Sequence, residues 1–186
     1  MPLSPPTPRR RIHDRVITMS TFERDDGFFD IESHLVDTKP MPIHRMMSKE
    51  TNPAGSHLHD LLIRFTVDEH FIIQGIEAAS DTTPYQICKE AENTLSVLVG
   101  EQVGKGWSRL VKAKLRGTVS CTHLKEMLIP MATVAFQGIT GLRFNVSTQE
   151  QVKPIPELIN SCYAFADHRE VVMQLWPQSH KPKHSS

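Results

Sequence analysis

Five histidine and cysteine residues lie where the sequence predicts that strands and helices begin. They are His57 and His59 at the start of an alternating segment, Cys88 in the first turn of an expected helix, and Cys121 and His123 at the start of a later helix. Imidazole and thiolate are donors that zinc and iron–sulfur clusters prefer, and such sites need three or four donors from different elements. We therefore predict a metal or cluster site with His59, Cys88 and Cys121 as core ligands. His57 or His123 would complete the set.

Each of these residues also has an ordinary structural explanation. Cys88 lies on an apolar stripe, and free cysteine is among the residue types most often buried in a core. A histidine at the end of a helix or strand commonly makes one hydrogen bond and no more. Asp60, on the strand face opposite His59, is expected to support the site indirectly or to lie at the surface. The spacing matches no zinc-finger pattern, so the prediction depends on whether the donors converge.

An enzyme is the alternative, with Cys121 as its nucleophile. At 100° per residue, the side chains of Cys121 and His123 would diverge by about 200° at a helix start, so we expect them not to pair. His59 is then the better-placed base, provided that the end of its strand faces Cys121.

A basic stripe runs along the second expected helix. Its members, spaced by four, three and four residues, are Lys105, Arg109, Lys112 and Arg116. Such a stripe suits the phosphates of a nucleotide, a coenzyme A thioester or a nucleic acid, and it is also typical of the solvated face of an amphipathic helix. The nearby glycines are too irregularly spaced to form a phosphate-binding loop.

The elements that must position these residues follow a change in hydrophobic period. Residues 11–39 and 57–80 alternate with a period of two and predict two pairs of strands, so that His57 and His59 would share one face. From about residue 82 the period is that of a helix, and three helices are predicted over 84–100, 105–116 and 122–140. We expect an α+β domain whose antiparallel sheet is covered on one face by these three helices.

Two further segments are irregular. Residues 40–56 contain three prolines and a glycine and are predicted to form a long loop. Residues 162–176 alternate like a late hairpin that turns at Asp167–His168, with a short helix as the alternative.

Composition places the elements in one domain, residues 11–176, between a flexible proline-rich arm at 1–10 and a flexible tail at 177–186. Equal numbers of Lys plus Arg and Asp plus Glu, 21 each, argue against a dedicated nucleic-acid or membrane-surface protein. We expect no secretion signal, because no apolar region follows the charges of the first eleven residues, and no membrane span, because no apolar run approaches the required length. Three widely spaced cysteines fit reduced thiols, so we expect a cytoplasmic protein. A third hypothesis is an accessory domain whose proline-rich arm docks a protein partner.

Seven motifs run through the chain: PLSPPTPRR, RDDGFFDIE, LVDTK, HDLLIRFTVD, PYQIC, GKGW and CTHLKEMLIPMATVAFQ. Together they resemble a bacterial family known as a domain of unknown function. The resemblance covers most of the chain, including CYAF near the end, and departs from the family at Asp167-His168-Arg169, where Asp-Gly is typical. For the enzyme alternative it implies a small catabolic enzyme acting on an aromatic or acyl-coenzyme A substrate, with Cys121 and His59 at the site and the basic stripe on phosphates.

Residues 57–136 are also similar in their order of elements to the U-type iron–sulfur cluster scaffold proteins. His57-Leu58-His59 lies where the scaffold has Cys-Gly-Asp, and Cys88 lies where it has its second cysteine. Cys121 falls on the last cysteine ligand, within Ser120–Glu126. This similarity implies a scaffold-like α+β fold and a site for zinc or an iron–sulfur cluster. Because a histidine replaces the first scaffold cysteine, it favours zinc.

Overall fold

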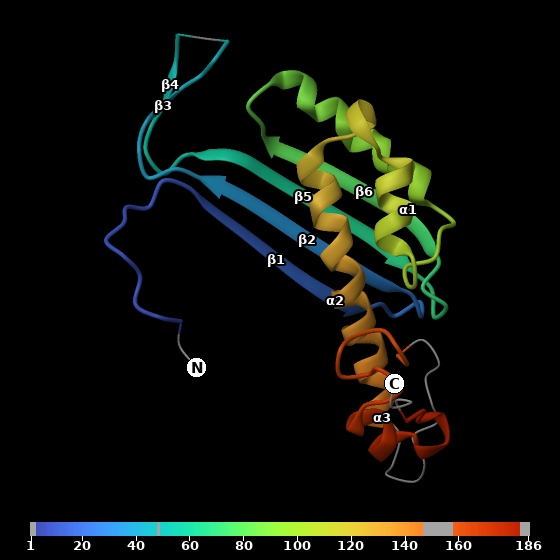
Figure 1. The fold of residues 1–186 in the computed structure, drawn as a ribbon. Helices are drawn as coiled ribbons and strands as arrows, with labels where there is room; N and C mark the ends of the chain where they lie inside the picture. Colours follow the sequence, from blue (N-terminus) through green and yellow to red (C-terminus); the bar gives the residue numbers. More distant parts are fainter. Residues whose placement is uncertain (1–2, 48, 147–157, 183–186) are drawn as a thin grey trace.

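The computed structural model describes residues 3–47, 49–146 and 158–182. Six strands come first, followed by α-helices and 3-10 helices (Figure 1). In chain order they are β1 (Asp14–Glu23), β2 (Phe29–Thr38), β3 (Ile43–His44), β4 (Thr51–Asn52), β5 (His57–Val67), β6 (Ile73–Thr82), η1 (Gln86–Leu98), α1 (Trp107–Lys114), η2 (Gly117–Val119), α2 (Thr122–Val146), α3 (Glu170–Leu175) and η3 (Pro177–Ser179).

Four antiparallel strands form the main sheet, in the spatial order β1-β2-β5-β6. The β1–β2 hairpin turns at Arg24–Gly27, where Gly27 has a φ of 84°, in the left-handed region that glycine adopts without steric cost. Residues 39–56 lie between β2 and β5, and the short strands β3 and β4 pair with each other within this segment. The predicted antiparallel sheet is confirmed.

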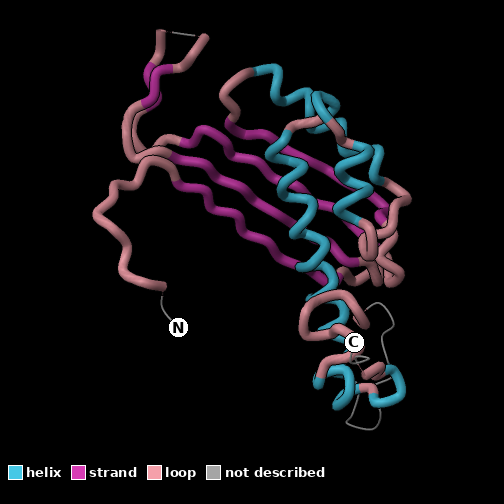
Figure 2. Tube along the Cα trace, viewed as in Figure 1, coloured by secondary structure: helices cyan, strands magenta, loops and turns pink. Residues whose placement is uncertain are grey.

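The core lies between one face of the sheet and the helices. Alternation along β2 and β5 buries Leu35, Leu61 and Phe65 on that face, and η1, α1 and α2 cover it (Figures 1 and 2). Trp107 of α1 is also buried, and its indole nitrogen donates a hydrogen bond of 2.8 Å to the carbonyl of Leu128 in α2. The structure therefore has the predicted α+β architecture, with helices on one face of the sheet.

The helix boundaries differ from those predicted. Asp81 and Thr82 continue β6, and the following segment is a 3-10 helix in which the hydroxyls of Thr94 and Ser96 bond to carbonyls three residues earlier. Such side-chain bonds compete with regular α-helical hydrogen bonding. Ile87, expected on the apolar stripe, is 68% exposed. The helix α1 starts only after Gly106, whose φ of 89° is incompatible with a helical residue.

The predicted late hairpin is wrong, and the alternative short helix is confirmed as α3. Val172 and Trp176 are buried four residues apart, which is helical spacing, and the Trp176 ring stacks on Phe165 at 5.8 Å. The tail expected from residue 177 begins with η3. Residues 3–13 have no helix or strand, and their side chains are exposed. Among the described residues, no helix combines the length and the apolar character needed to span a membrane.

Candidate metal site

A β-bulge separates His57 from His59. In the β2–β5 pair, Asp37 lies opposite His59 and the next residue, Thr38, lies opposite His57, so Leu58 is an extra residue in β5. An extra residue turns the preceding side chain to the other face of the sheet. The prediction that the two histidines share a face is therefore wrong, because two-residue alternation does not hold across a bulge.

Asp37 is the buried centre of the site, with only 1% of its surface exposed. Its carboxylate accepts two hydrogen bonds of 2.8 Å from the guanidinium of Arg15, which lies opposite it on β1. Nδ1 of His59 is 2.8 Å away, and Nε2 of His13 is 3.3 Å away. Burial acts to raise the pKa of Asp37, but the hydrogen bonds and charge of Arg15, with those of His59, outweigh it and hold the pKa below its usual value.

The ionised Asp37 fixes the orientation of His59. A carboxylate can only accept hydrogen bonds, so Nδ1 of His59 is the donor, and in the neutral ring Nε2 is left with a free lone pair. The side chain of His59 is 15% exposed, so its ring is held in place yet still reaches solvent.

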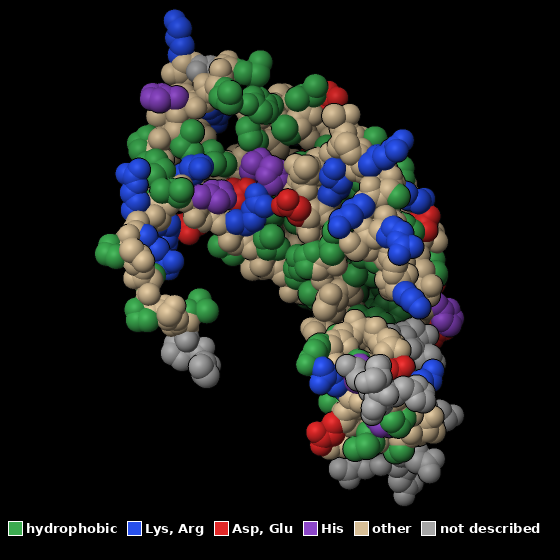
Figure 3. Space-filling view, viewed as in Figure 1, with side chains coloured by type: hydrophobic (Ala, Val, Ile, Leu, Met, Phe, Trp, Pro, Cys, Tyr) green, Lys and Arg blue, Asp and Glu red, His purple; other side chains and the backbone are tan. Residues whose placement is uncertain are grey.

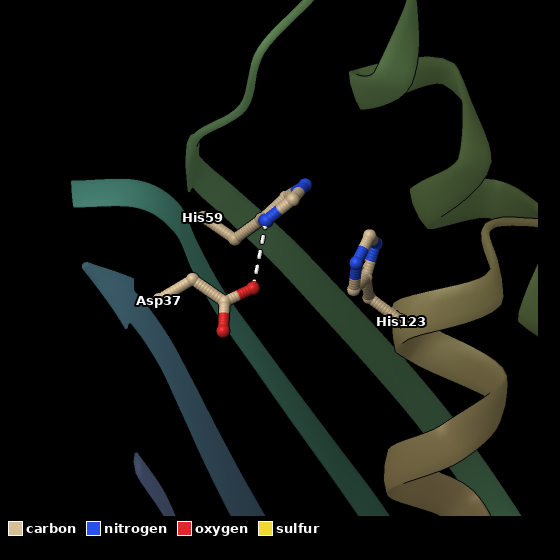
Figure 4. Close-up of side chains that lie close together, drawn as sticks. All are labelled: Asp37, His59 and His123. Atoms are coloured by element: carbon tan, nitrogen blue, oxygen red, sulfur yellow. Dashed lines mark hydrogen bonds and ion pairs between the residues drawn. The ribbon is translucent and has the colours of Figure 1, made fainter. Parts of the chain in front are cut away.

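The first turn of α2 brings a second imidazole to this pair. Figure 4 shows Asp37 and His59 at the neighbouring ends of β2 and β5, with His123 opposite them on α2. The centroids of the two imidazole rings are 3.9 Å apart, with an angle of 37° between their planes. One ligand atom from each of Asp37, His59 and His123 lies within 4.8 Å of the others.

Cys121 lies beside His123, contrary to the expectation that their side chains diverge. The Cys121 sulfur is 3.7 Å from Nδ1 of His123. Cys121 precedes the first helical residue, Thr122, and its carbonyl accepts the backbone N–H of Lys125, so it is the N-cap of α2. The helical rotation of 100° per residue therefore does not apply to it.

The start of α2 also alters the chemistry of the Cys121 thiol, which is partly buried. Burial acts to raise the pKa of Cys121, but the hydrogen bond with His123 and the backbone N–H groups of Leu124 and His123 outweigh it and lower the pKa. A helix N-terminus stabilises a thiolate through these N–H groups and the helix dipole. The sulfur is therefore suited to act as a metal ligand or as a nucleophile.

The other expected ligands lie elsewhere. His57 is 2.7 Å from the carboxylate of Asp60, which is also 2.6 Å from Nε2 of His34. This second group lies on the face of the sheet that no described helix covers (Figure 1). Cys88 lies in η1 as a partly exposed free thiol. Within the described part of the chain, neither His57 nor Cys88 belongs to a group of three ligand atoms that all lie within 4.8 Å of one another, and Cys121 does not either.

Sequence reasoning did not single out Asp37 and Arg15. A signal for their contact was present, because a hairpin that turns at Arg24–Gly27 places Arg15 directly opposite Asp37, and opposite charges favour such cross-strand pairs. The pairing of Asp37 with His59 had no such signal, since the irregular segment 39–56 hides the β2–β5 register.

Comparison with known proteins identifies a family for the chain. Residues 13–137 match the model of the family described as "Protein of unknown function (DUF2889)". These residues include the main sheet, η1, α1, the first part of α2 and the Asp37 site. No curated protein and no solved structure is similar enough to count as a match, so the similarity to iron–sulfur scaffolds gains no support from them. The match covers more than half of the chain, and the chain belongs to this family of unknown function.

Proposed function

We propose that Asp37, His59, Cys121 and His123, named here the Asp37 cluster, bind a divalent metal ion, with zinc as the first candidate. The observation that carries this proposal is the hydrogen bond from Nδ1 of His59 to the buried carboxylate of Asp37. Histidines that bind metals almost always donate their other ring N–H to such an acceptor, which fixes the ring and raises its basicity.

Three donors would then hold the ion: Nε2 of His59, a ring nitrogen of His123 and the sulfur of Cys121. Zinc lies about 2.0–2.3 Å from nitrogen and sulfur ligands, so donors that share one ion are about 3–4 Å apart. The 3.7 Å between the Cys121 sulfur and Nδ1 of His123 falls in this range. The ring centroids of His59 and His123 are 3.9 Å apart, while the Cys121 sulfur lies outside the group of ligand atoms within 4.8 Å of one another. The three donors would therefore share one ion only after their side chains rotate.

Asp37 would support this site without binding the ion itself. Both of its oxygens already accept hydrogen bonds from Arg15, and one of them also accepts His59. Two imidazoles and one thiolate leave the fourth tetrahedral position to water, which is the arrangement of catalytic zinc sites. The proposed function is thus a zinc protein whose ion can still accept a water molecule or a substrate.

The iron–sulfur alternative receives less support from the described residues. Clusters are held mainly by cysteine thiolates, and the scaffold similarity required Cys88 beside Cys121. The close group of ligand atoms around His59 contains neither cysteine, and Cys121 adjoins it through His123 at 3.7 Å. Zinc accommodates a mixed set of nitrogen and sulfur donors without a second cysteine.

The lowered pKa of Cys121 supports a second candidate function, thiol catalysis. His123, at 3.7 Å, would serve as its base, in place of the His59 that the sequence suggested. His59 would then contribute through its ring contact with His123. An aromatic or acyl-coenzyme A substrate, and a protein partner for the proline-rich arm, stay predictions.

Metal analysis of protein made without an affinity tag separates the two candidates. We expect about one zinc ion per chain after dialysis against excess zinc and then buffer, and a large loss in His59→Ala and His123→Ala. His34→Ala is the matched control, because it removes an aspartate-bound histidine from the other face and should keep the zinc. A zinc content well below one ion per chain, and the same in the unaltered protein and all variants, would contradict the metal site. Rapid alkylation of Cys121 that depends on His123 would then favour thiol catalysis.

A further inference from the structure

The segment from residue 102 to residue 125 is strongly basic in a chain without net charge. It contains no Asp or Glu and six Lys or Arg residues: Lys105, Arg109, Lys112, Lys114, Arg116 and Lys125. Glu101 and Glu126 end the segment on either side. An excess of one sign over so short a stretch creates a local positive potential, although the whole chain is balanced at 21 charges of each sign.

The fold exposes most of this charge on α1 and just beyond its two ends. The helix α1 buries Trp107 and Val111 against the core, and Leu115 follows them at the same spacing. The opposite side therefore faces solvent and carries Arg109 and Lys112, and the exposed Lys105 and Arg116 lie just beyond the two ends of the helix. These four cations are named here the α1 stripe. Figure 3 shows Lys and Arg side chains gathered over the helices, on the same side of the molecule as a group of histidine side chains.

The four cations of the α1 stripe are not neutralised within the described part of the protein. The nearby Lys114 has a partner, Glu101, at 2.6 Å, and Lys125 donates to the carbonyl of Gly117. The α1 stripe has no carboxylate within ion-pair distance among the described residues. Uncompensated arginines and lysines in a row suit phosphate groups, because arginine binds them through two N–H groups and lysine as a point charge.

The α1 stripe leads to the Asp37 cluster. Arg116 caps η2, which directly precedes Ser120 and Cys121 at the start of α2. α1 is about 12 Å long at 1.5 Å per residue, a length that a small phosphorylated molecule can span. A nucleic acid would need a longer basic track, and the flanking Glu101 and Glu126 interrupt one here.

We propose that the α1 stripe binds the phosphate groups of a phosphorylated small molecule whose remaining part reaches the Asp37 cluster. Phosphate binding at the stripe is independent of the proposed metal site. The approach to Cys121 and His123 rests on the proposed function, since it assumes that the Asp37 cluster is where the ligand is used.

Binding of inorganic tripolyphosphate to the full-length, EDTA-treated protein tests the first half of the proposal. We expect calorimetric binding that weakens as salt is added, and an affinity at least about ten-fold lower in Arg109→Glu/Lys112→Glu. Lys39→Glu/Lys49→Glu is the matched control, with the same change of charge in the segment around β3 and β4, and it should bind like the unaltered protein. The double variant His59→Ala/His123→Ala should keep tripolyphosphate binding even where it has lost zinc, which separates this inference from the metal proposal.

Alkylation of Cys121 tests whether the stripe leads to the site. In EDTA-treated protein, we measure the ratio of the alkylation rates of Cys121 by anionic iodoacetate and by neutral iodoacetamide. The α1 stripe should raise this ratio, so Arg109→Glu/Lys112→Glu should lower it, whereas Lys39→Glu/Lys49→Glu should leave it unchanged. An equal ratio of the two alkylation rates in both charge variants would overturn the proposal that the α1 stripe guides an anionic ligand to Cys121. Three results would overturn the phosphate site: no tripolyphosphate binding, equal loss in both charge variants, or much tighter binding of a single-stranded oligonucleotide than of tripolyphosphate.

Discussion

His57 and His59 lie two residues apart in β5, yet their Nδ1 atoms contact different aspartates, Asp60 at 2.7 Å and Asp37 at 2.8 Å. The bulge at Leu58 turns the two side chains to opposite faces of the sheet. A second imidazole lies beside each pair, His123 beside His59 and His34 at Asp60, and the Cys121 thiol adjoins His123. The pair at Asp60 has similar local chemistry, but among the described residues its ligand atoms form no group of three within 4.8 Å of one another, so it serves as an internal control.

Asp37→Asn should lower the affinity for zinc by about 10- to 100-fold, because the amide no longer holds His59 as a charged acceptor does. It should also destabilise the fold by about 1–2 kcal/mol, since Arg15 loses its buried partner and keeps only Glu126 at 2.8 Å. Asp60→Asn makes the same chemical change on the other face and should leave the affinity for zinc unchanged. Zinc titrations with a competing chelator, at a temperature where both variants are folded, measure the difference. An equal loss of zinc affinity in both variants would contradict the supporting role of Asp37.

The sequence predicts the frame of the site better than the site itself. Alternation and turn residues indicate the four long strands, and the change of period indicates the helices, because each signal depends on neighbours in the chain. The Arg15–Asp37 contact follows from the hairpin turn for the same reason.

Three differences from the predicted site depend on contacts that no local pattern records. The bulge at Leu58 arises where β5 pairs with β2 after an irregular segment, and no residue type there requires it. Cys121 approaches His123 because it caps α2 instead of continuing it, and helix boundaries are the least certain part of a periodic pattern. The sequence places Cys88 on the apolar stripe of an expected α-helix. Its segment is instead a 3-10 helix with three residues per turn, so each side chain faces a different direction from the one expected.

Acid should weaken the contribution of Asp60 to stability. Burial acts to raise the pKa of Asp60, but the hydrogen bonds from His34 and His57 outweigh it and lower the pKa. The contribution is then fully present above the unfolded-state pKa of about 3.9, and it is lost as the pH falls through the lower folded-state value. Because both histidines are nearly half exposed, we expect Asp60→Asn to cost about 1 kcal/mol at neutral pH.

Urea unfolding of EDTA-treated protein measures that difference. The gap in stability between Asp60→Asn and the unaltered protein should narrow below about pH 4, where the carboxyl of Asp60 is increasingly protonated. A gap that stays constant down to the acid limit of folding would mean that the charge of Asp60 contributes nothing.

Zinc should protect Cys121 from alkylation and leave Cys162 reactive. Cys121 is a proposed ligand, and a metal-bound thiolate is a poorer nucleophile, whereas Cys162 is exposed and lies outside the cluster. Mass spectrometry of peptides after brief treatment with iodoacetamide, with and without zinc, gives the reactivity of each cysteine separately. Similar protection of both cysteines would point to non-specific binding of zinc by thiols.

Gly138→Ala should destabilise the contact between α2 and β1. A Cβ atom at Gly138 would lie 2.7 Å from Cβ and 2.8 Å from Cγ2 of Thr21, whose hydroxyl also donates a hydrogen bond to the carbonyl of Val134. Relieving this overlap requires a shift of the helix or the strand, which costs about 1–3 kcal/mol. The matched control is Gly141→Ala, where the added methyl meets no atom within 4 Å and should stabilise the helix by up to about 1 kcal/mol. Thermal unfolding of both variants should thus shift the midpoint in opposite directions, and equal shifts would show that α2 does not approach β1 this closely.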